Sequence, residues 1–256
     1  MLRKLFKAAA PRPAKPKASL PAGQRVYAIG DIHGRLDLLR ALVARIEADD
    51  SARTAAKTSL ILLGDLVDRG PQSAQVIDYL RDLAASRAPG STRFLLGNHE
   101  EVFLAALEDE KSLRFFTRIG GRETILSYGI DEDRYAALDY AELRDELRHR
   151  VPPEHVAFLN GFEDMIVLGD YVFVHAGIDP ASPLAAQRPK NLRWIREEFL
   201  SHPGPLEKVV VHGHTIFDEV SYGTHRIGLD TGAYMTGNLT AMGFEGDTRW
   251  TLDTRA

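Results

Sequence analysis

One arrangement occurs three times in the first 110 residues of this sequence, and it constrains the fold more than any other feature. A short apolar segment ends in glycine and polar residues, and a helical pattern follows at 35–48, 73–86 and 101–110. Successive strand-then-helix units of this length form parallel sheets. The carboxyl ends of such strands meet at one edge, where open α/β sheets bind ligands. We therefore predict an α/β fold with a polar site at that edge.

The second half of the sequence differs in its predicted secondary structure, because it contains many short β segments. Segments 165–168 and 171–174 flank Gly169 and Asp170, which favour a hairpin turn. Further strands are expected at 208–211, 219–222, 225–229, 238–245 and 247–252. We expect this half to form a second sheet packed on the first.

Composition limits the possible functions. The chain has 256 residues, of which 44% are hydrophobic, so it can bury a substantial core. It contains no Cys, which excludes disulfides, thiolate ligands and a cysteine nucleophile. The net charge of -4 argues against nucleic-acid binding, and no apolar run approaches the ~20 residues that span a bilayer. With no secretory signal pattern, we expect a cytoplasmic protein without stable membrane insertion.

The N-terminal segment differs from the rest of the chain. Residues 1–20 carry six Lys or Arg and no acid, and Pro, Ala and Lys dominate. We predict a disordered basic tail over residues 1–22, with at most weak membrane contact through residues 1–7. Residues 23–256 are expected to form one domain, with a helical insert at about 113–160 over one side of the sheet.

Charged residues cluster where the second apolar segment ends. Asp65, Asp68 and Arg69 directly follow the segment 59–63. An Asp at a strand tip can hold a metal, and an Arg four residues later can hold an anion beside it. The alternative is an ordinary polar turn, since Gly64, Asp and Pro71 all favour turns.

Histidines support the metal interpretation. Five of the nine follow predicted strands: His33, His99, His175, His212 and His214. Asp31 and His33 lie two residues apart, so an extended strand tip points both the same way. One set supplies oxygen and imidazole ligands without sulfur: Asp31, His33, Asp65, Asn98, His175 and His214. That set is too large for one catalytic ion with open positions and suits two ions that share an Asp.

Five motifs in order resemble those of the calcineurin-like metallophosphoesterases, and more narrowly the phosphoprotein phosphatases in their compact bacterial and phage form. They are Gly30-Asp31-Ile32-His33-Gly34, Gly64-Asp65-Leu66-Val67-Asp68-Arg69-Gly70, Gly97-Asn98-His99-Glu100, His175-Ala176-Gly177 and Gly213-His214-Thr215. Trp194-Ile195-Arg196 and Asp230-Thr231-Gly232-Ala233 also match, so the resemblance covers about residues 25–240. It implies two packed mixed β-sheets flanked by helices, an α/β/β/α sandwich.

The resemblance also implies a ligand set for each ion. Asp31, His33 and Asp65 would hold the first metal, while Asp65, Asn98, His175 and His214 would hold the second. Two cations would stabilise a hydroxide that attacks phosphorus in line. The oxygen and nitrogen donors favour Mn²⁺, with Fe or Zn as alternatives.

Other residues receive roles around the phosphate. Arg69 and Arg196 would grip its oxygens together with Asn98, because guanidinium offers paired donors. Arg193, three residues away on a helix, competes with Arg196, although the Trp-x-Arg pattern favours Arg196. His99 would protonate the leaving group, oriented by Asp68. His212 is expected to support the metal ligands without binding the metal itself, and Asp230 is expected to be a hydrogen-bonding scaffold residue.

The implied activity is metal-dependent hydrolysis of phosphomonoesters. A serine/threonine protein phosphatase fits this pattern best, acting on a phosphoprotein or a small phosphoester, because paired arginines favour a terminal phosphate. The alternative is a symmetrical dinucleoside tetraphosphate hydrolase, which needs room for two nucleosides. A non-catalytic metal-binding adaptor is a third hypothesis, although every expected catalytic position is filled.

Overall fold

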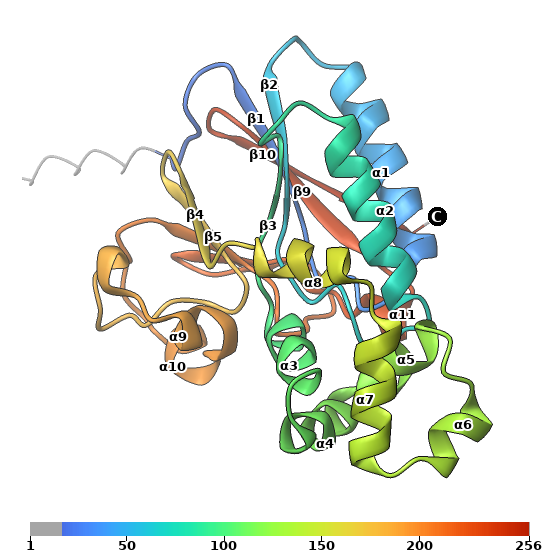
Figure 1. Cartoon of the computed structure of the whole chain (residues 1–256). Coiled ribbons are helices and arrows are strands. Elements are labelled where there is room, and N and C mark those ends of the chain that lie inside the picture. The colour runs from blue at the N-terminus through green and yellow to red at the C-terminus, as the bar shows by residue number, and fades with distance from the viewer. Residues whose placement is uncertain (1–16, 256) are drawn as a thin grey trace, which may run out of the picture.

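The computed structural model describes residues 17–255, so residues 1–16 of the predicted tail lie outside it (Figure 1). Two five-stranded sheets have the orders β10-β9-β1-β2-β3 and β4-β5-β6-β8-β7. The strands are β1 Gln24–Ile29, β2 Lys57–Leu62, β3 Thr92–Phe94, β4 Met165–Leu168, β5 Tyr171–Val174, β6 Val209–His212, β7 Ser221–Tyr222, β8 Arg226–Gly228, β9 Thr240–Glu245 and β10 Thr248–Asp253. The predicted fold class, two mixed sheets flanked by helices, is confirmed.

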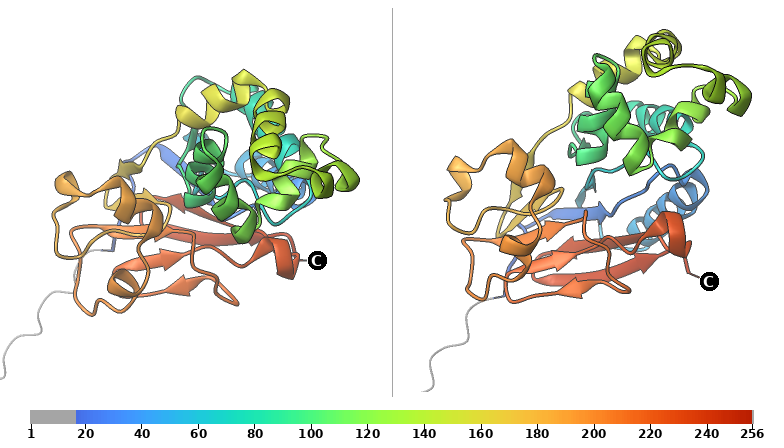
Figure 2. Two further views of the ribbon diagram at one scale, coloured as in Figure 1. Left: turned by 60° about the horizontal axis from the view of Figure 1, so that its bottom comes forward. Right: turned by 90° about the horizontal axis from the view of Figure 1, so that it is seen from below.

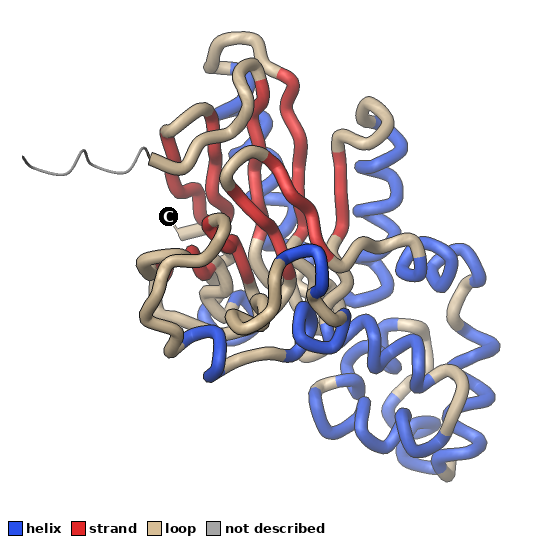
Figure 3. Tube along the Cα trace, turned by 90° about the vertical axis from the view of Figure 1, so that its left-hand side faces the viewer, coloured by secondary structure: helices blue, strands red, loops and turns tan. Residues whose placement is uncertain are grey.

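Side-chain alternation in β1 explains why the sheets form layers. Tyr27 and Ile29 belong to the core under the helices α1 (Leu36–Ser51) and α2 (Ser73–Ser86). Val26 and Ala28 belong to the core between the two sheets. Successive side chains of a strand point to opposite faces, so one apolar strand supplies both cores. Figure 3 shows the strands of both sheets gathered together, with helices behind and beside them.

A third core lies on the far side of the second sheet. It joins Val172, Val174 and Val210 of the sheet to Leu192 and Phe199. These last two residues belong to short helices, α9 (Pro189–Trp194) and α10 (Glu197–Leu200), which follow the turn η1 (Leu184–Ala186). Helix, sheet, sheet and helix therefore follow one another through the molecule.

The remaining helices gather beyond the carboxyl ends of β1, β2 and β3 (Figures 1 and 2). They are α3 Asn98–Ala106, α4 Glu110–Ile119, α5 Gly121–Ser127, α6 Glu132–Ala137, α7 Tyr140–Arg150 and α8 Pro153–Asn160, while the four-residue α11 (Ala233–Thr236) follows β8. Phe103 stacks on Phe116 and Tyr128 with ring centroids 5.4 and 5.8 Å apart. This aromatic core attaches the helices 110–160 to α3, which begins at a predicted metal ligand.

The C-terminal hairpin differs from the sequence-based expectation. β9 pairs antiparallel with β1, as in Val26 opposite Phe244, so β9 and β10 extend the first sheet rather than the second. Met242 and Phe244 of β9 enter the core between the sheets. Pairing with β9 also covers the edge of β1 that would otherwise be open.

The N-terminal boundary also differs from the prediction, since part of the expected tail is packed. Leu20 is 4% exposed and lies in the core between the sheets. Its N–H donates to Gly246 O at 2.9 Å, and Asp170 N–H donates to Ser19 O at 3.0 Å. Residues 18–20 therefore close one end of this core, because burying Leu20 offsets the cost of ordering them. Within residues 17–255, none of the helices is long and apolar enough to cross a membrane.

Candidate metal centre

The predicted ligands converge from both sheets. Residues that follow β1, β2 and β3 meet residues at or after the ends of β5 and β6, and all are buried: Asp31, His33, Asp65, Asn98, His99, His175, His212 and His214. Asp65 is the link, since it belongs to two groups of possible metal-binding side chains. The first group adds His33 and His99, and the second adds His175 and His214.

Strained backbone conformations occur in the segments that carry the predicted site residues. Among the described residues, five non-glycine positions have positive φ: His33 (47°), Asp65 (48°), Asp68 (72°), Arg69 (68°) and His214 (62°). Such conformations cost about 1–3 kcal/mol each and persist at sites where the surroundings enforce them. The neighbouring glycine at 213 has no room for a side chain, because a Cβ there would collide with Oδ1 of Asp31. These strained conformations therefore lower the stability of the fold, and they fix the direction of the side chains at these positions.

The second group has the spacing of ligands around one cation. His175 Nε2 lies 3.0 Å from Asn98 Oδ1, 3.1 Å from His214 Nδ1 and 3.3 Å from Asp65 Oδ1. His175 Nδ1 donates to Leu63 O at 2.8 Å, so Nε2 carries the lone pair. Donors bonded to one ion at about 2.1 Å lie roughly 3.0–3.4 Å apart. These four atoms therefore fit a divalent cation.

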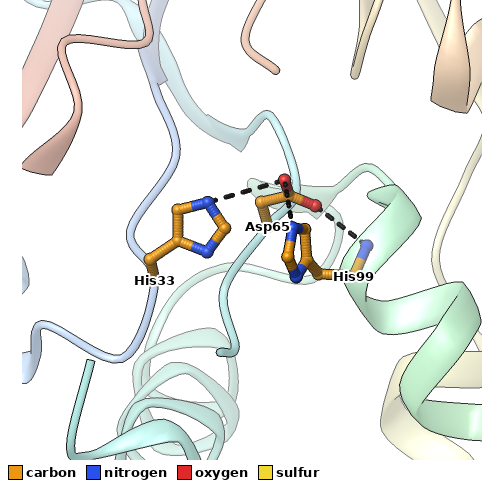
Figure 4. A group of neighbouring side chains, drawn as sticks. All are labelled: His33, Asp65 and His99. Atoms are coloured by element: carbon orange, nitrogen blue, oxygen red, sulfur yellow. Dashed lines mark hydrogen bonds and ion pairs between the residues drawn. The ribbon is translucent and has the colours of Figure 1, made fainter. Parts of the chain in front are cut away.

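The first group is looser (Figure 4). Asp65 Oδ2 lies 3.7 Å from His33 Nε2 and 3.9 Å from His99 Nε2. His33 Nδ1 donates to Val67 O at 2.8 Å, and burial lowers the pKa of His33 to about 3, so this imidazole is neutral with a free Nε2 lone pair. Arg69 NH1 donates to His33 Nε2 at 2.9 Å, and Arg69 NH2 lies 3.0 Å from His99 Nε2. A cation held by His33 would displace this guanidinium.

Asp31 is placed differently from its expected partners. Its carboxylate accepts the His214 N–H at 2.9 and 3.1 Å, and the group around His33 contains His99 instead. Burial, with the nearby charges of Asp230 and Asp65, raises the pKa of Asp31 well above its ordinary value. That concentration of buried negative charge favours a cation beside it. The role of Asp31 as a ligand stays a prediction.

The two competing arginines have different environments. Arg193 donates to Glu101 at 2.8 Å and to Asp164 at 2.7 Å, so two carboxylates hold it. Arg196 is exposed and reaches Thr215 Oγ1 at 3.3 Å, next to His214. Arg196 is therefore the one free to meet a phosphate. His212 lies outside both groups, with its ring 5.2 Å from that of Phe199.

His99 forms a buried pair with Asp68. Its Nδ1 lies 2.6 Å from Asp68 Oδ2, and Thr124 Oγ1 donates to Asp68 Oδ1 at 2.6 Å. Burial acts to lower the pKa of His99, but the carboxylates of Asp65 and Asp68 outweigh it and raise that pKa. A protonated imidazole held this way can donate a proton. Thr124, on α5, has no signal in the sequence that identifies it.

Glu100 is a second residue that sequence reasoning left without a role. Its carboxylate accepts four backbone N–H groups, from Leu66 (2.7 Å), Asp65 (2.9 Å), Gly97 (3.0 Å) and Val67 (3.2 Å). It therefore holds the strained turn that carries Asp65. Burial and the charge of Asp65 raise the pKa of Glu100 to about 7. Its place in Gly-Asn-His-Glu was the only available signal.

The variant Glu100→Gln should destabilise the protein by about 2–4 kcal/mol, because the amide nitrogen cannot accept and leaves buried N–H groups unpaired. Urea unfolding with the metals removed measures this directly. The matched control is Glu110→Gln, which breaks an exposed ion pair with Arg114 and should cost less than about 1 kcal/mol. Equal stability of the two variants would contradict this role for Glu100.

Comparisons with known proteins identify the family of this chain. A family model described as calcineurin-like phosphoesterase matches residues 24–238. Proteins named symmetrical bis(5'-nucleosyl)-tetraphosphatase are 32% identical over 185 residues in Acidovorax ebreus (strain TPSY) and over 188 residues in Methylococcus capsulatus. These alignments cover 72% and 73% of the chain but 51% of each relative. The chain thus spans about half the length of the curated relatives it matches.

Solved structures share the fold at low identity. One, provisionally named a diadenosine tetraphosphatase, has a TM-score of 0.61 at 21% identity and covers 93% of this chain and 99% of that one. A cold-active protein tyrosine phosphatase has a TM-score of 0.58 at 20% identity, covering 93% and 80%. At these identities the likeness concerns the fold alone.

Proposed function

The chain belongs to the calcineurin-like phosphoesterases, and from this membership we propose that it hydrolyses dinucleoside tetraphosphates symmetrically. The curated relatives carry that activity in their names, which shifts the preference from the protein phosphatase expected at first. One geometric observation carries the proposal: two cavities of nucleoside size share Trp194, and one of them is also lined by Arg196.

The two cavities share one aromatic side chain, Trp194. One, of about 530 Å³, is also lined by Lys190 and Arg196. The other, of about 510 Å³, is lined by Val102 and Phe115. Pockets for small ligands measure about 300–1,000 Å³. A substrate with two nucleosides can therefore place one on each side of Trp194.

The aromatic residues in these cavities are suited to nucleobases. Phe115 is 43% exposed, and its ring lies 6.3 Å from that of Trp194. Trp194 Nε1 donates to Glu101 Oε2 at 2.5 Å, which holds the indole in place. Stacking on an aromatic side chain contributes about 1–3 kcal/mol per base.

The proposed chemistry divides between metal and protein. Two divalent cations held by the donors described above would acidify a water and neutralise phosphate charge. Arg69 and Arg196 bind phosphate oxygens and orient the phosphorus for attack. Glu100 keeps the Asp65 turn in place, and Asp68 holds the His99 proton at Nδ1, leaving Nε2 directed at the site.

The direct test is incubation of the full chain with diadenosine tetraphosphate and Mn²⁺. Symmetrical cleavage yields ADP as the only nucleotide product. Formation of ATP and AMP, or no turnover while p-nitrophenyl phosphate is hydrolysed, would reject this proposal and leave the phosphoesterase centre intact.

The variant Trp194→Leu should raise KM for diadenosine tetraphosphate about 10-fold, since it removes a stacking surface worth about 1–3 kcal/mol. KM for p-nitrophenyl phosphate, which has no nucleobase, should change less than about 2-fold. Tyr79→Leu, a half-buried aromatic on α2, is the control and should alter neither value. A parallel rise for both substrates would show that Trp194 does not bind a base.

A second candidate activity is hydrolysis of phosphoserine or phosphothreonine in proteins. The Asp68–His99 pair favours it, because an alkoxide leaving group needs a proton donor whereas a nucleotide does not. Phosphate release from a phosphopeptide in the same screen tests this candidate.

A further inference from the structure

A cavity of about 620 Å³ lies at the opposite ends of the strands from the metal centre. It is formed where β5, β6 and β8 begin, with the start of β10 at its side. Four cationic residues line it: Lys17, Lys208, Arg226 and Arg249. They come from four separate segments that only the fold brings together.

These cations are not neutralised by the protein. Within residues 17–255, no carboxylate lies within 4 Å of any of the four cationic groups. Two acids in the lining are engaged elsewhere: Asp170 accepts the Ser19 N–H at 3.0 Å, and Glu207 accepts the Leu184 N–H at 3.1 Å. The cavity is therefore positive in a chain whose net charge is -4.

Arg226 is the clearest example of a cation in this cavity that has no carboxylate partner among the described residues. Its NH1 donates to Ser221 Oγ at 3.0 Å, and its guanidinium lies 5.4 Å from the ring centre of Phe217. Burial lowers the pKa of Arg226, and no acid opposes that effect. A partly buried guanidinium without a counter-charge gains by binding an anion.

The chain's own N-terminal segment cannot supply that anion. Residues 1–16 carry Arg3, Lys4, Lys7, Arg12 and Lys15 and no Asp or Glu. They add positive charge to the sequence immediately before Lys17. An anion that balances these cations would therefore come from another molecule.

We propose that this cavity binds a phosphate-bearing anion of nucleotide size, separate from the substrate. Guanidinium groups match phosphate oxygens in pairs, and several converging cations suit a diphosphate or triphosphate. A volume of about 620 Å³ is adequate for a nucleotide. The proposal does not depend on which phosphoester the metal centre cleaves.

Three strands connect this cavity to the metal centre. β5, β6 and β8 are parallel neighbours that begin at the cavity. β5 is followed by His175, β6 is followed by His214, and β8 leads to Asp230. A four-residue strand is about 13 Å long, so the ligand does not touch the metal donors. It acts instead on the starts of the strands that carry them, as a regulator would.

Equilibrium dialysis with methylenediphosphonate, a diphosphate that cannot be hydrolysed, tests the second site. The full chain is loaded with Mn²⁺, and Mn²⁺ is present on both sides of the membrane. We expect a stoichiometry near two. The double variant Arg226→Gln/Arg249→Gln should bind near one, with affinity at the lost site reduced at least about 10-fold. Its kcat for p-nitrophenyl phosphate should stay within about 2-fold of wild type.

The controls separate the second site from the catalytic one. Arg40→Gln/Arg118→Gln removes the same charge from exposed positions away from the cavity and should keep two sites. Arg69→Gln/Arg196→Gln should lose the other site instead. Should the double variant misfold, Arg249→Gln alone replaces an exposed side chain and should still weaken the second site. A wild-type stoichiometry of one, or equal loss in the Arg40/Arg118 control, would overturn the proposal.

Discussion

Replacing Asp65 with Asn should reduce kcat by about 1,000-fold or more on every phosphoester. Asp65 contributes to both groups of possible metal ligands, with Oδ1 facing His175 and Oδ2 facing His33 and His99. The amide has no charge and only one oxygen, so it cannot serve two cations. Metal ions contribute several kcal/mol of transition-state stabilisation, which corresponds to about this change in rate.

Two measurements on Asp65→Asn together test whether Asp65 is a ligand shared by two cations. The first is turnover of p-nitrophenyl phosphate with saturating Mn²⁺, and the second is metal content by elemental analysis after dialysis. Asp170→Asn, the same change at the β4–β5 turn, should retain wild-type turnover and metal. A variant at Asp65 that binds two equivalents of metal and keeps more than a tenth of the activity would refute the shared-ligand role.

Replacing His99 with Asn should have an effect that depends on the leaving group. General acids contribute about 10²–10⁴-fold when the leaving group is strongly basic, as a serine alkoxide is. A departing nucleotide is a stable phosphate anion, with a pKa of about 6 for its last proton, and needs no such help. We expect a loss of about 1,000-fold on a phosphoserine peptide and less than about 10-fold on diadenosine tetraphosphate.

The same comparison for Asp68→Asn separates orientation from proton transfer. Asp68 touches His99 and Thr124 but belongs to neither group of possible metal ligands, so its loss should follow the same substrate order with a smaller magnitude. Metal content should remain at the wild-type level in this variant. Equal losses on both substrates in His99→Asn would mean that His99 serves as a metal ligand, as its proximity to Asp65 and His33 also allows.

Local patterns predicted the first sheet well. The apolar repeats of 35–48 and 73–86 correspond to α1 and α2, and the three apolar segments correspond to β1, β2 and β3. Periodicity succeeded here because each helix buries one stripe of its own sequence, such as Leu39, Leu42 and Ile46 in α1. The hairpin at Gly169 and Asp170 was predicted for a similar reason, since its turn chemistry is local.

The choice of pairing partner for each strand was not predictable in the same way. β9 is buried along almost its whole length, and nothing in its residues says that it pairs with β1 rather than with β8. The packing of Leu20 between the sheets depends on Gly246, 226 positions later. Such pairings are decided by which edge or gap the completed fold leaves open.

The sequence by itself determined which side chains could bind metal and that they follow strand ends, because ligand chemistry and strand periodicity are both local properties. Only the tertiary structure decided that His99, rather than Asp31, shares a space with His33 and Asp65. It also introduced Glu100 and Thr124 as supports, through contacts such as Glu100 with Leu66, 34 positions apart, and Thr124 with Asp68, 56 positions apart. Distances between such segments depend on sheet packing and strained turns, which no short stretch of residues encodes.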